Sequence, residues 1–252
     1  MTSRFSIGSV PFDNTTVSYV LETITRLIVS RRGGFIVTPN IDHIVIAHRD
    51  VRLRDVYRRA RLSLPDGQPV VWMARLLGAG AVPKISGSDL IEPLMAHAAE
   101  HAHPVFLFGA SPESSAEAAR RLEQRYPRLR IVGRDTSLLS SHDTTAPEDS
   151  PVVQAIRASG AHIVVVAMGA PKQELWMARH ADALRPAVLL GLGASLDFVA
   201  GTVTRAPRWL SNAGLEWLYR LAQEPRRLAY RYLVRDLSIV PILARDLVHR
   251  KG

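Results

Sequence analysis

Asp66 stands in a Leu-Pro-Asp-Gly turn, directly after the strand-like run 62–64. Gly67 permits a sharp change of chain direction and a helical pattern begins near Pro69, so the carboxylate is expected to project from the end of a strand. A partly desolvated aspartate beside a bound anion is more basic than one in water and can accept a proton from a substrate hydroxyl. The other interpretation is an aspartate that only shapes the turn or caps the helix.

Polar side chains also follow two other predicted elements. Thr38 and Asn40 come after the strand-like run 35–37 and before an apolar helical pattern. Asn40 suits the N-cap of that helix, and the free amide groups behind it suit an anion or a hydroxyl, although capping alone would also explain the residue. Gln173 follows Pro171, which opens a further predicted helix. A long side-chain amide in that first turn is well placed to reach sugar hydroxyls.

Gly191 and Gly193 come directly after the strand-like run 188–190. Glycines there let the backbone approach a nucleotide, while Asp197 can accept a hydrogen bond from its ribose or base. The pair fails as a dinucleotide-binding fingerprint because Leu196 occupies the third position, where glycine or alanine is required. The chain also lacks a P-loop motif and an Asp-x-Asp pair that would hold a metal on a diphosphate, so arginine and lysine would have to stabilise a departing diphosphate.

The elements that would position these groups follow a regular order. Short β-rich runs alternate with segments of helical periodicity, which predicts a Rossmann-like α/β fold with a mainly parallel sheet and helices on both faces. Right-handed crossovers place the carboxyl ends of the strands at one edge, where open sheets bind ligands, and all four polar motifs fall on that edge. The predicted strands are 35–37, 62–64, 105–108, 130–132, 163–166 and 188–190.

Size and composition fit one catalytic α/β domain, expected at residues 1–200, followed by a basic, aromatic helical appendage at residues 201–252. The chain has 252 residues, of which 47% are apolar, enough to bury a substantial core. The absence of cysteine excludes disulfides, thiolate zinc sites and cysteine nucleophiles. Neither a long apolar stretch nor a signal-peptide pattern occurs, so we expect a cytoplasmic protein.

The net charge of +9 is concentrated near the end of the chain. Residues 205–252 hold ten basic and four acidic residues, a local charge of +6. Such asymmetry predicts an anionic partner, for which lipid headgroups, nucleic acid and diphosphates all qualify, and a solvated basic tail is the alternative.

Arginines and aromatic residues share this basic tail. Arg227, Arg231 and Arg235 fall four residues apart and so lie on one helical face, where a phosphate-rich partner would offset their mutual repulsion. Tryptophan and tyrosine side chains between residues 209 and 232 suit a membrane interface, although packing against the domain would also explain them. Two prolines, Pro225 and Pro241, are expected to divide the tail into short helices.

Several motifs in combination make the sequence resemble the WecG/TagA/CpsF glycosyltransferases, glycosyltransferase family 26, over about residues 5–235. They are Thr-Pro-Asn at 38–40, Asp66-Gly67 with Val70-Val71-Trp72, Gly87-Ser88-Asp89-Leu90, Gly169 with Pro171-Lys172-Gln173-Glu174, Arg205-Ala-Pro, and Gly214-Leu215-Glu216-Trp217.

The resemblance implies transfer of a sugar from a UDP-sugar to the 4-hydroxyl of a sugar carried on a polyprenyl diphosphate. The reaction would proceed with inversion and without metal or other cofactor. It would serve teichoic acid, capsule or exopolysaccharide synthesis at the inner face of the bacterial cell membrane. Glucose, N-acetylmannosamine and glucuronic acid all stay open as the transferred sugar, as does homo-oligomerisation.

The resemblance also implies roles for single residues. Asp66 would be the base, Thr38, Asn40 and Gln173 would contact substrate, Asp197 would contact the nucleoside, and Arg220, Arg227 and Arg231 would close over the diphosphate. Lys84 stands where the family commonly has arginine; it keeps the positive charge for substrate binding but loses the bidentate fork. Pro65 replaces the commoner alanine and stiffens the turn.

Two other functions compete with this interpretation. A nucleic-acid-binding α/β protein could use the same basic tail, but it gives no reason for Asp66, Thr38 and Gln173 to converge, so we expect no nucleic acid partner. A nucleotide-sugar epimerase or dehydrogenase could use a similar sheet, but the failed dinucleotide fingerprint disfavours it.

Overall fold

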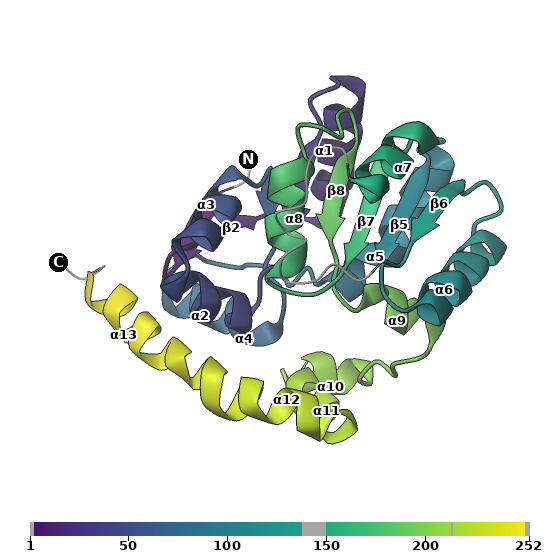
Figure 1. Cartoon of the computed structure of the whole chain (residues 1–252). Helices are drawn as coiled ribbons and strands as arrows, with labels where there is room; N and C mark the ends of the chain where they lie inside the picture. Colours follow the sequence, from purple (N-terminus) through teal and green to yellow (C-terminus); the bar gives the residue numbers. More distant parts are fainter. Residues whose placement is uncertain (1–2, 138–149, 213, 250–252) are drawn as a thin grey trace.

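A parallel sheet of six strands lies at the centre of the part of the chain that this computed structural model describes, residues 3–137, 150–212 and 214–249 (Figure 1). The strand order is β4-β3-β8-β7-β5-β6. Each predicted run overlaps one strand, and the predicted Rossmann-like α/β fold is confirmed. The strands are β3 (Gly34–Val37), β4 (Leu62–Ser63), β5 (Val105–Gly109), β6 (Ile131–Asp135), β7 (Ile163–Ala167) and β8 (Val188–Gly191).

Helices cover both faces of this sheet and bury a separate apolar core on each. Successive strand residues point to opposite faces, so Phe108 and Val166 enter one core while Leu107 and Val165 enter the other. One core contains residues of α2 (Ile41–Arg49), α3 (Val51–Arg59), α4 (Gln68–Leu76), α7 (Pro151–Ser159) and α8 (Lys172–His180). The other contains residues of α1 (Val17–Val29), α5 (Gly87–Glu100), α6 (Pro112–Arg125) and α9 (Ser195–Ala200).

Helix starts follow the capping residues that the sequence offers. Ser86 and Ser111 accept hydrogen bonds from backbone N–H groups in the first turns of α5 and α6. Pro171 is the N-cap of α8, so Gln173 lies in the first turn as predicted. Residues 136–150 are rich in serine, threonine, aspartate and proline, which predicts a surface loop, but most of them, residues 138–149, lie outside the described residues.

An antiparallel hairpin of β1 (Ser3–Ile7) and β2 (Val10–Asn14) precedes the sheet, and our sequence analysis missed it. Phe5 and Phe12 stack across the two strands with ring centroids 5.4 Å apart. Asp13 accepts a hydrogen bond of 2.7 Å from the backbone N–H of Ser63, which ties the hairpin to β4. Alternating apolar residues around Gly8, which has φ of 57°, were a usable hairpin signal.

The C-terminal segment forms a succession of helices that runs along the carboxyl edge of the sheet and past α2 (Figure 1). Leu228 and Ile242 are buried, and the Gly8 N–H donates a 2.5 Å hydrogen bond to Asp246. The segment therefore packs against the α/β part of the chain. Its elements are α10 (Arg208–Asn212), α11 (Glu216–Gln223), α12 (Pro225–Tyr230), the π-helical turn η2 (Arg231–Arg235), the 3-10 turn η3 (Asp236–Ser238) and α13 (Ile239–His249).

Both prolines of this segment lie at helix starts, and the tail is divided into short helices as expected. Pro225 begins α12. Pro241 lies in the first turn of α13, which follows the 3-10 turn η3. A backbone N–H has no intrahelical acceptor in a first turn, so proline removes no helical hydrogen bond there.

A close contact joins the C-terminal segment to α4. Gly214 has φ of 72°, and a side chain at this position would overlap the indole ring of Trp72. Two of the quoted motifs, Val70-Val71-Trp72 and Gly214-Leu215-Glu216-Trp217, therefore meet in space. Glycine is required at Gly214 both for the backbone conformation and for this approach.

Candidate active site

A cavity of about 870 Å³ opens between the carboxyl edge of the sheet and the C-terminal segment. Open parallel sheets bind ligands at this edge. Most of the predicted site residues line the cavity: Thr38, Asn40, Asp66, Gln173, Gly193, Asp197, Arg220 and Arg231.

Asp66 lies half-buried in this cavity, just past the end of β4. Its backbone N–H donates to the carbonyl of Pro39 at 3.1 Å, which fixes the turn beside the end of β3. Among the described residues, none forms a hydrogen bond or ion pair with its carboxylate. The N-cap of α4 is instead Gly67, whose φ of 98° favours glycine. The capping interpretation of Asp66 therefore does not hold.

The surroundings of Asp66 raise its pKa to about 6. Burial is the main cause, and the negative charge of Glu216 acts in the same direction, while His43 and Lys84 oppose the shift. Burial disfavours the charged carboxylate, so its affinity for a proton increases. A pKa near the working pH suits a general base.

Thr38, the first residue after β3, forms a hydrogen bond with Gly191, the last residue of the neighbouring strand β8. The Thr38 hydroxyl donates a 2.9 Å hydrogen bond to the carbonyl of Gly191, and the residue is buried. Gly191 itself does not belong to the described cavity wall; a side chain there would collide with Met177 and crowd Gln173. Both residues therefore fix the floor of the cavity.

Asn40 is the N-cap of α2, as predicted. Its side-chain oxygen accepts hydrogen bonds from the Asp42 backbone N–H at 3.1 Å and from Arg231 of the C-terminal segment at 3.2 Å, and it lies 2.7 Å from the His43 ring. Asn40 thus connects the start of α2 to the C-terminal segment.

Gln173 is buried, with only 2% of its surface exposed. Its side-chain oxygen accepts hydrogen bonds from the backbone N–H groups of Gly169 and Gly193, each at 3.2 Å. Its side-chain nitrogen donates to Glu174 at 2.8 Å. The amide therefore holds together the two loops that follow β7 and β8.

Lys84 contacts other side chains of the protein, and it is not among the described residues that line the cavity. Its Nζ forms an ion pair of 2.8 Å with Asp89 and a hydrogen bond of 3.4 Å with Ser211. Arg205 pairs with the same carboxylate. Burial would raise the pKa of Asp89, but hydrogen bonds from Lys84, Arg205 and Ser86 outweigh it and lower that pKa to about 2. This network joins the start of α5 to the C-terminal segment.

Arginines of the C-terminal segment line the opposite wall. Arg220 lies over the Phe198 ring, 5.6 Å from its centroid. Arg231 and Arg235 both form ion pairs with Asp42, at 3.1 and 2.6 Å. The side chain of the third predicted arginine, Arg227, lies outside the described residues.

The model of the glycosyl transferase WecG/TagA/CpsF family matches residues 5–252. The chain belongs to this family. Its members act in cell-surface polysaccharide synthesis, and the family implies a nucleotide-sugar donor and a lipid-linked acceptor. The glycosyltransferase interpretation is thus favoured over the nucleic-acid-binding and epimerase or dehydrogenase alternatives.

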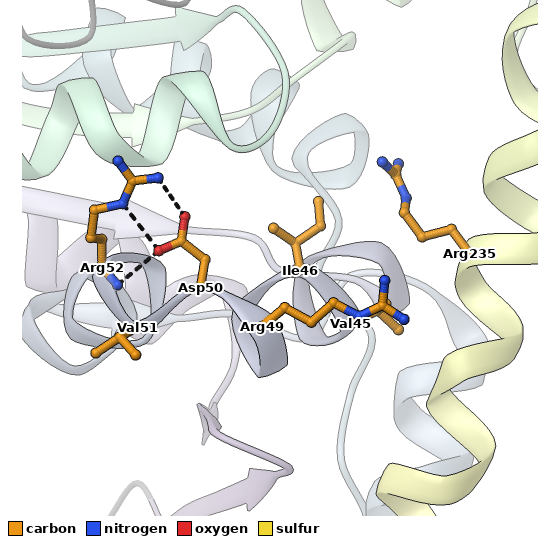
Figure 2. A pocket seen from close by; sticks show the side chains of 7 residues that line it. All are labelled: Val45, Ile46, Arg49, Asp50, Val51, Arg52 and Arg235. Carbon is orange, nitrogen blue, oxygen red and sulfur yellow. Dashed lines mark hydrogen bonds and ion pairs between the residues drawn. The ribbon is translucent and has the colours of Figure 1, made fainter.

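The glycosyltransferase has a second hollow, of about 470 Å³, beside the junction of α2 and α3 (Figure 2). Asp50 is the N-cap of α3 and binds Arg52 there, with nitrogen to oxygen distances of 2.8 to 3.1 Å. Arg235 reaches toward this hollow from the C-terminal segment and also lines the main cavity. It therefore lies between the two.

Further charged or titratable residues of the glycosyltransferase cavity were not assigned to the site from the sequence. Asp42, His43, Glu216 and Asp236 line it, as does Arg235. The spacing that placed Arg235 on one face with Arg231 was a usable signal, because both pair with Asp42. Asp42 and His43 lie next to the Thr-Pro-Asn motif and Glu216 lies within another motif, whereas Asp236 had no signal.

Proposed function

We propose that the protein transfers a sugar from a UDP-sugar to a saccharide linked to a polyprenyl diphosphate, with inversion and without a metal. The observation that carries the proposal is the carboxylate of Asp66, which has no partner among the described residues and faces a cavity whose other wall holds Arg220, Arg231 and Arg235. A base opposite a group of cations suits a reaction in which a hydroxyl attacks and a diphosphate leaves.

In this proposal the hydroxyl oxygen of the acceptor attacks the anomeric carbon of the donor, and Asp66 accepts the proton of that hydroxyl. The bond from that carbon to the UDP oxygen breaks, and UDP leaves with the bonding electrons. Attack opposite the leaving group gives inversion. Arg220 and Arg231 would stabilise the charge on the departing diphosphate, together with Arg227.

The remaining cavity residues would shape the substrate site. Gly193 has φ of 54° and open space where a side chain would begin, so its backbone can lie close to a nucleotide. Asp197 lines the cavity nearby and would accept a hydrogen bond from the nucleoside. Thr38, Asn40 and Gln173 would contact the substrate and at the same time keep the hydrogen bonds to the protein that are described above. Lys84 would act only through Asp89 and Ser211.

The reaction is expected to depend on pH through Asp66. The base must be ionised, and its pKa is raised to about 6, so kcat/KM should fall about tenfold per pH unit below that value and level off above it. Steady-state transfer rates between pH 4.5 and 8.5 test this, with folding at each pH followed by circular dichroism. A profile without a limb between pH 5 and 7 would remove Asp66 from the role of base.

The C-terminal segment, residues 201–252, would close the cavity and rest on the membrane. An exposed apolar row recurs along it at helical spacing, and every helix within the described residues is too short or too polar to span a bilayer. Such a row beside many arginines suits the surface of an anionic membrane. The row consists of Tyr230, Leu233, Val234, Leu237, Val240 and Val248.

Binding to vesicles that contain anionic lipid is therefore expected, and it should weaken as salt rises. The double substitution Leu237→Asp with Val240→Asp should reduce binding by about tenfold or more, because each side chain would otherwise bury apolar area in the interface. Val29→Asp is the matched control, since Val29 is 74% exposed at the end of α1. Vesicle flotation measures all three proteins. Equal flotation of the double variant and the control would contradict the proposed membrane surface.

The proposed function is tested by incubating the protein with a panel of UDP-sugars and a short-chain prenyl diphosphate sugar as acceptor. Product from UDP-glucose, UDP-N-acetylmannosamine or UDP-glucuronic acid supports the proposal and identifies the donor. Absence of transfer and of donor hydrolysis across the panel would contradict it.

A further inference from the structure

Asp42 is a buried carboxylate that the proposed chemistry does not use. Its side chain is only 4% exposed, although it lies at the wall of the main cavity. Two guanidinium groups from the C-terminal segment pair with it, Arg231 through Nε at 3.1 Å and Arg235 through Nε at 2.6 Å. A buried charge of this kind is retained only where partners compensate it.

The geometry of these pairs leaves donors available. Both arginines meet Asp42 through Nε rather than through their terminal nitrogen atoms. One terminal nitrogen of Arg231 donates to Asn40, and for Arg235 no described residue accepts from either terminal nitrogen. Both side chains line the main cavity. Terminal N–H groups of guanidinium are the donors that match phosphate oxygens.

Asp42 also lies at the N-terminal end of a helix. It is in the first turn of α2, two residues after the N-cap Asn40, where the helix dipole favours a negative charge. Asp42, Arg231 and Arg235 by themselves carry a net positive charge, which suits an anionic ligand. Asp236 lies beside these three groups at the cavity wall, and it offsets that charge when it is ionised; burial raises the pKa of Asp236 to about 6. Without the carboxylate the two guanidinium groups would repel each other and adopt many rotamers, so ordering them on a ligand would cost more entropy.

We propose that Asp42 is a positioning residue, which holds Arg231 and Arg235 so that their terminal N–H groups meet the diphosphate of the UDP-sugar. The inference rests on the proposed function, because it takes a nucleoside diphosphate as the ligand. Asp42 acts through the two arginines and does not touch the substrate.

The test is the affinity for UDP, measured by isothermal titration calorimetry on the full chain. Asp42→Asn keeps the size of the side chain and removes its charge, and it should weaken UDP binding about ten- to a hundredfold, as misplaced binding groups do. Asp42→Glu should recover part of the loss. Asp50→Asn is the control: Asp50 pairs with Arg52 in the outer hollow (Figure 2), and asparagine caps a helix equally well, so UDP affinity should stay within about a factor of two.

Arg235→Gln and the double variant with Asp42→Asn complete a mutant cycle. Asp42 acts through Arg235 in part, so the double variant should bind UDP more tightly than the product of the single losses predicts. Equal UDP affinity of Asp42→Asn and wild type, or strictly additive losses, would overturn the inference.

Loss of UDP affinity could also follow if Asp42 merely docks the C-terminal segment, so limited proteolysis of that segment is the second readout. Leu228, Ile242 and Asp246 hold the segment independently, and cleavage of Asp42→Asn should match that of wild type. Asp246→Ala, which removes the acceptor for Gly8, marks the rate of a loosened segment. Cleavage of Asp42→Asn at that faster rate would show that Asp42 docks the C-terminal segment, and it would contradict the proposed positioning role. A wild type that binds no UDP would instead contradict the proposed function itself.

Discussion

Asp66→Asn is expected to lower kcat/KM for sugar transfer by about 10²-fold or more while the UDP-sugar donor binds nearly as tightly as to wild type. Asparagine occupies the same space at the cavity wall but cannot accept the proton of the acceptor hydroxyl. Arg220 and Arg231, which would bind the donor diphosphate, lie on the C-terminal segment and are untouched. Transfer rates and calorimetric donor affinity measure the two effects separately.

The stability of this variant provides an internal control. The pKa of Asp66 in the folded state is raised to about 6, so the protonated carboxyl stabilises the folded protein relative to the unfolded chain. This stabilisation is complete at a pH below the unfolded-state pKa. That contribution is lost as pH rises through about 6, so the wild type carries a disfavoured charge at pH 7.5. Asp66→Asn should therefore have a Tm at pH 7.5 no lower than wild type. Asp55→Asn is the control for removing one carboxylate charge, because the side chain of Asp55 on α3 is 63% exposed. Transfer within a factor of a few of wild type would exclude Asp66 as the base.

Gln173→Leu is expected to lose both stability and transfer. The substitution preserves the approximate size of the side chain but removes the acceptor for the backbone N–H groups of Gly169 and Gly193 and the donor to Glu174. Each buried polar group left without a partner costs about 1 to 3 kcal/mol. The two loops would separate, and we expect kcat/KM to fall about tenfold to a hundredfold because the cavity wall moves.

Urea unfolding and transfer rates measure the two losses of Gln173→Leu. Gln124→Leu is the matched control, because Gln124 is exposed on α6. Gln173→Glu retains oxygen acceptors for both loops but places a second buried carboxylate against Glu174, so it should be less stable than wild type at neutral pH. A Gln173→Leu protein as stable and active as the control would show that the amide does not hold the loops.

Much of the fold was predictable because its signals are local. Apart from the edge strand β6, the strands of the main sheet are short, mostly apolar runs that are buried on both faces. Ser86, Ser111 and Asn40 mark helix starts through hydrogen bonds to the next few residues. The order of these elements then places Asp66 and Gln173 at one edge. The β1–β2 hairpin was missed although its alternation around Gly8 was visible.

The partners of the site residues were not predictable, because they are set by contacts between distant parts of the chain. Thr38 bonds to Gly191 across 153 positions, and Arg231 bonds to Asn40 across 191. Neither pair has a local pattern. Lys84 was assigned to substrate because it stands where the family commonly has arginine and keeps the positive charge, yet Asp89 pairs with that charge in the folded protein. Charge can be counted along a sequence, whereas its compensation depends on packing.

The contact between Trp72 and Gly214 places a fluorophore at the seam between α4 and the C-terminal segment. The indole of Trp72 is 48% exposed, so water already reaches part of it and the backbone at Gly214 shields another part. Any movement of the segment away from α4 changes that shielding and hence the emission. Because Gly214 has no side chain, the indole of Trp72 can lie against the C-terminal segment, and its fluorescence reports movement of that segment without an added label.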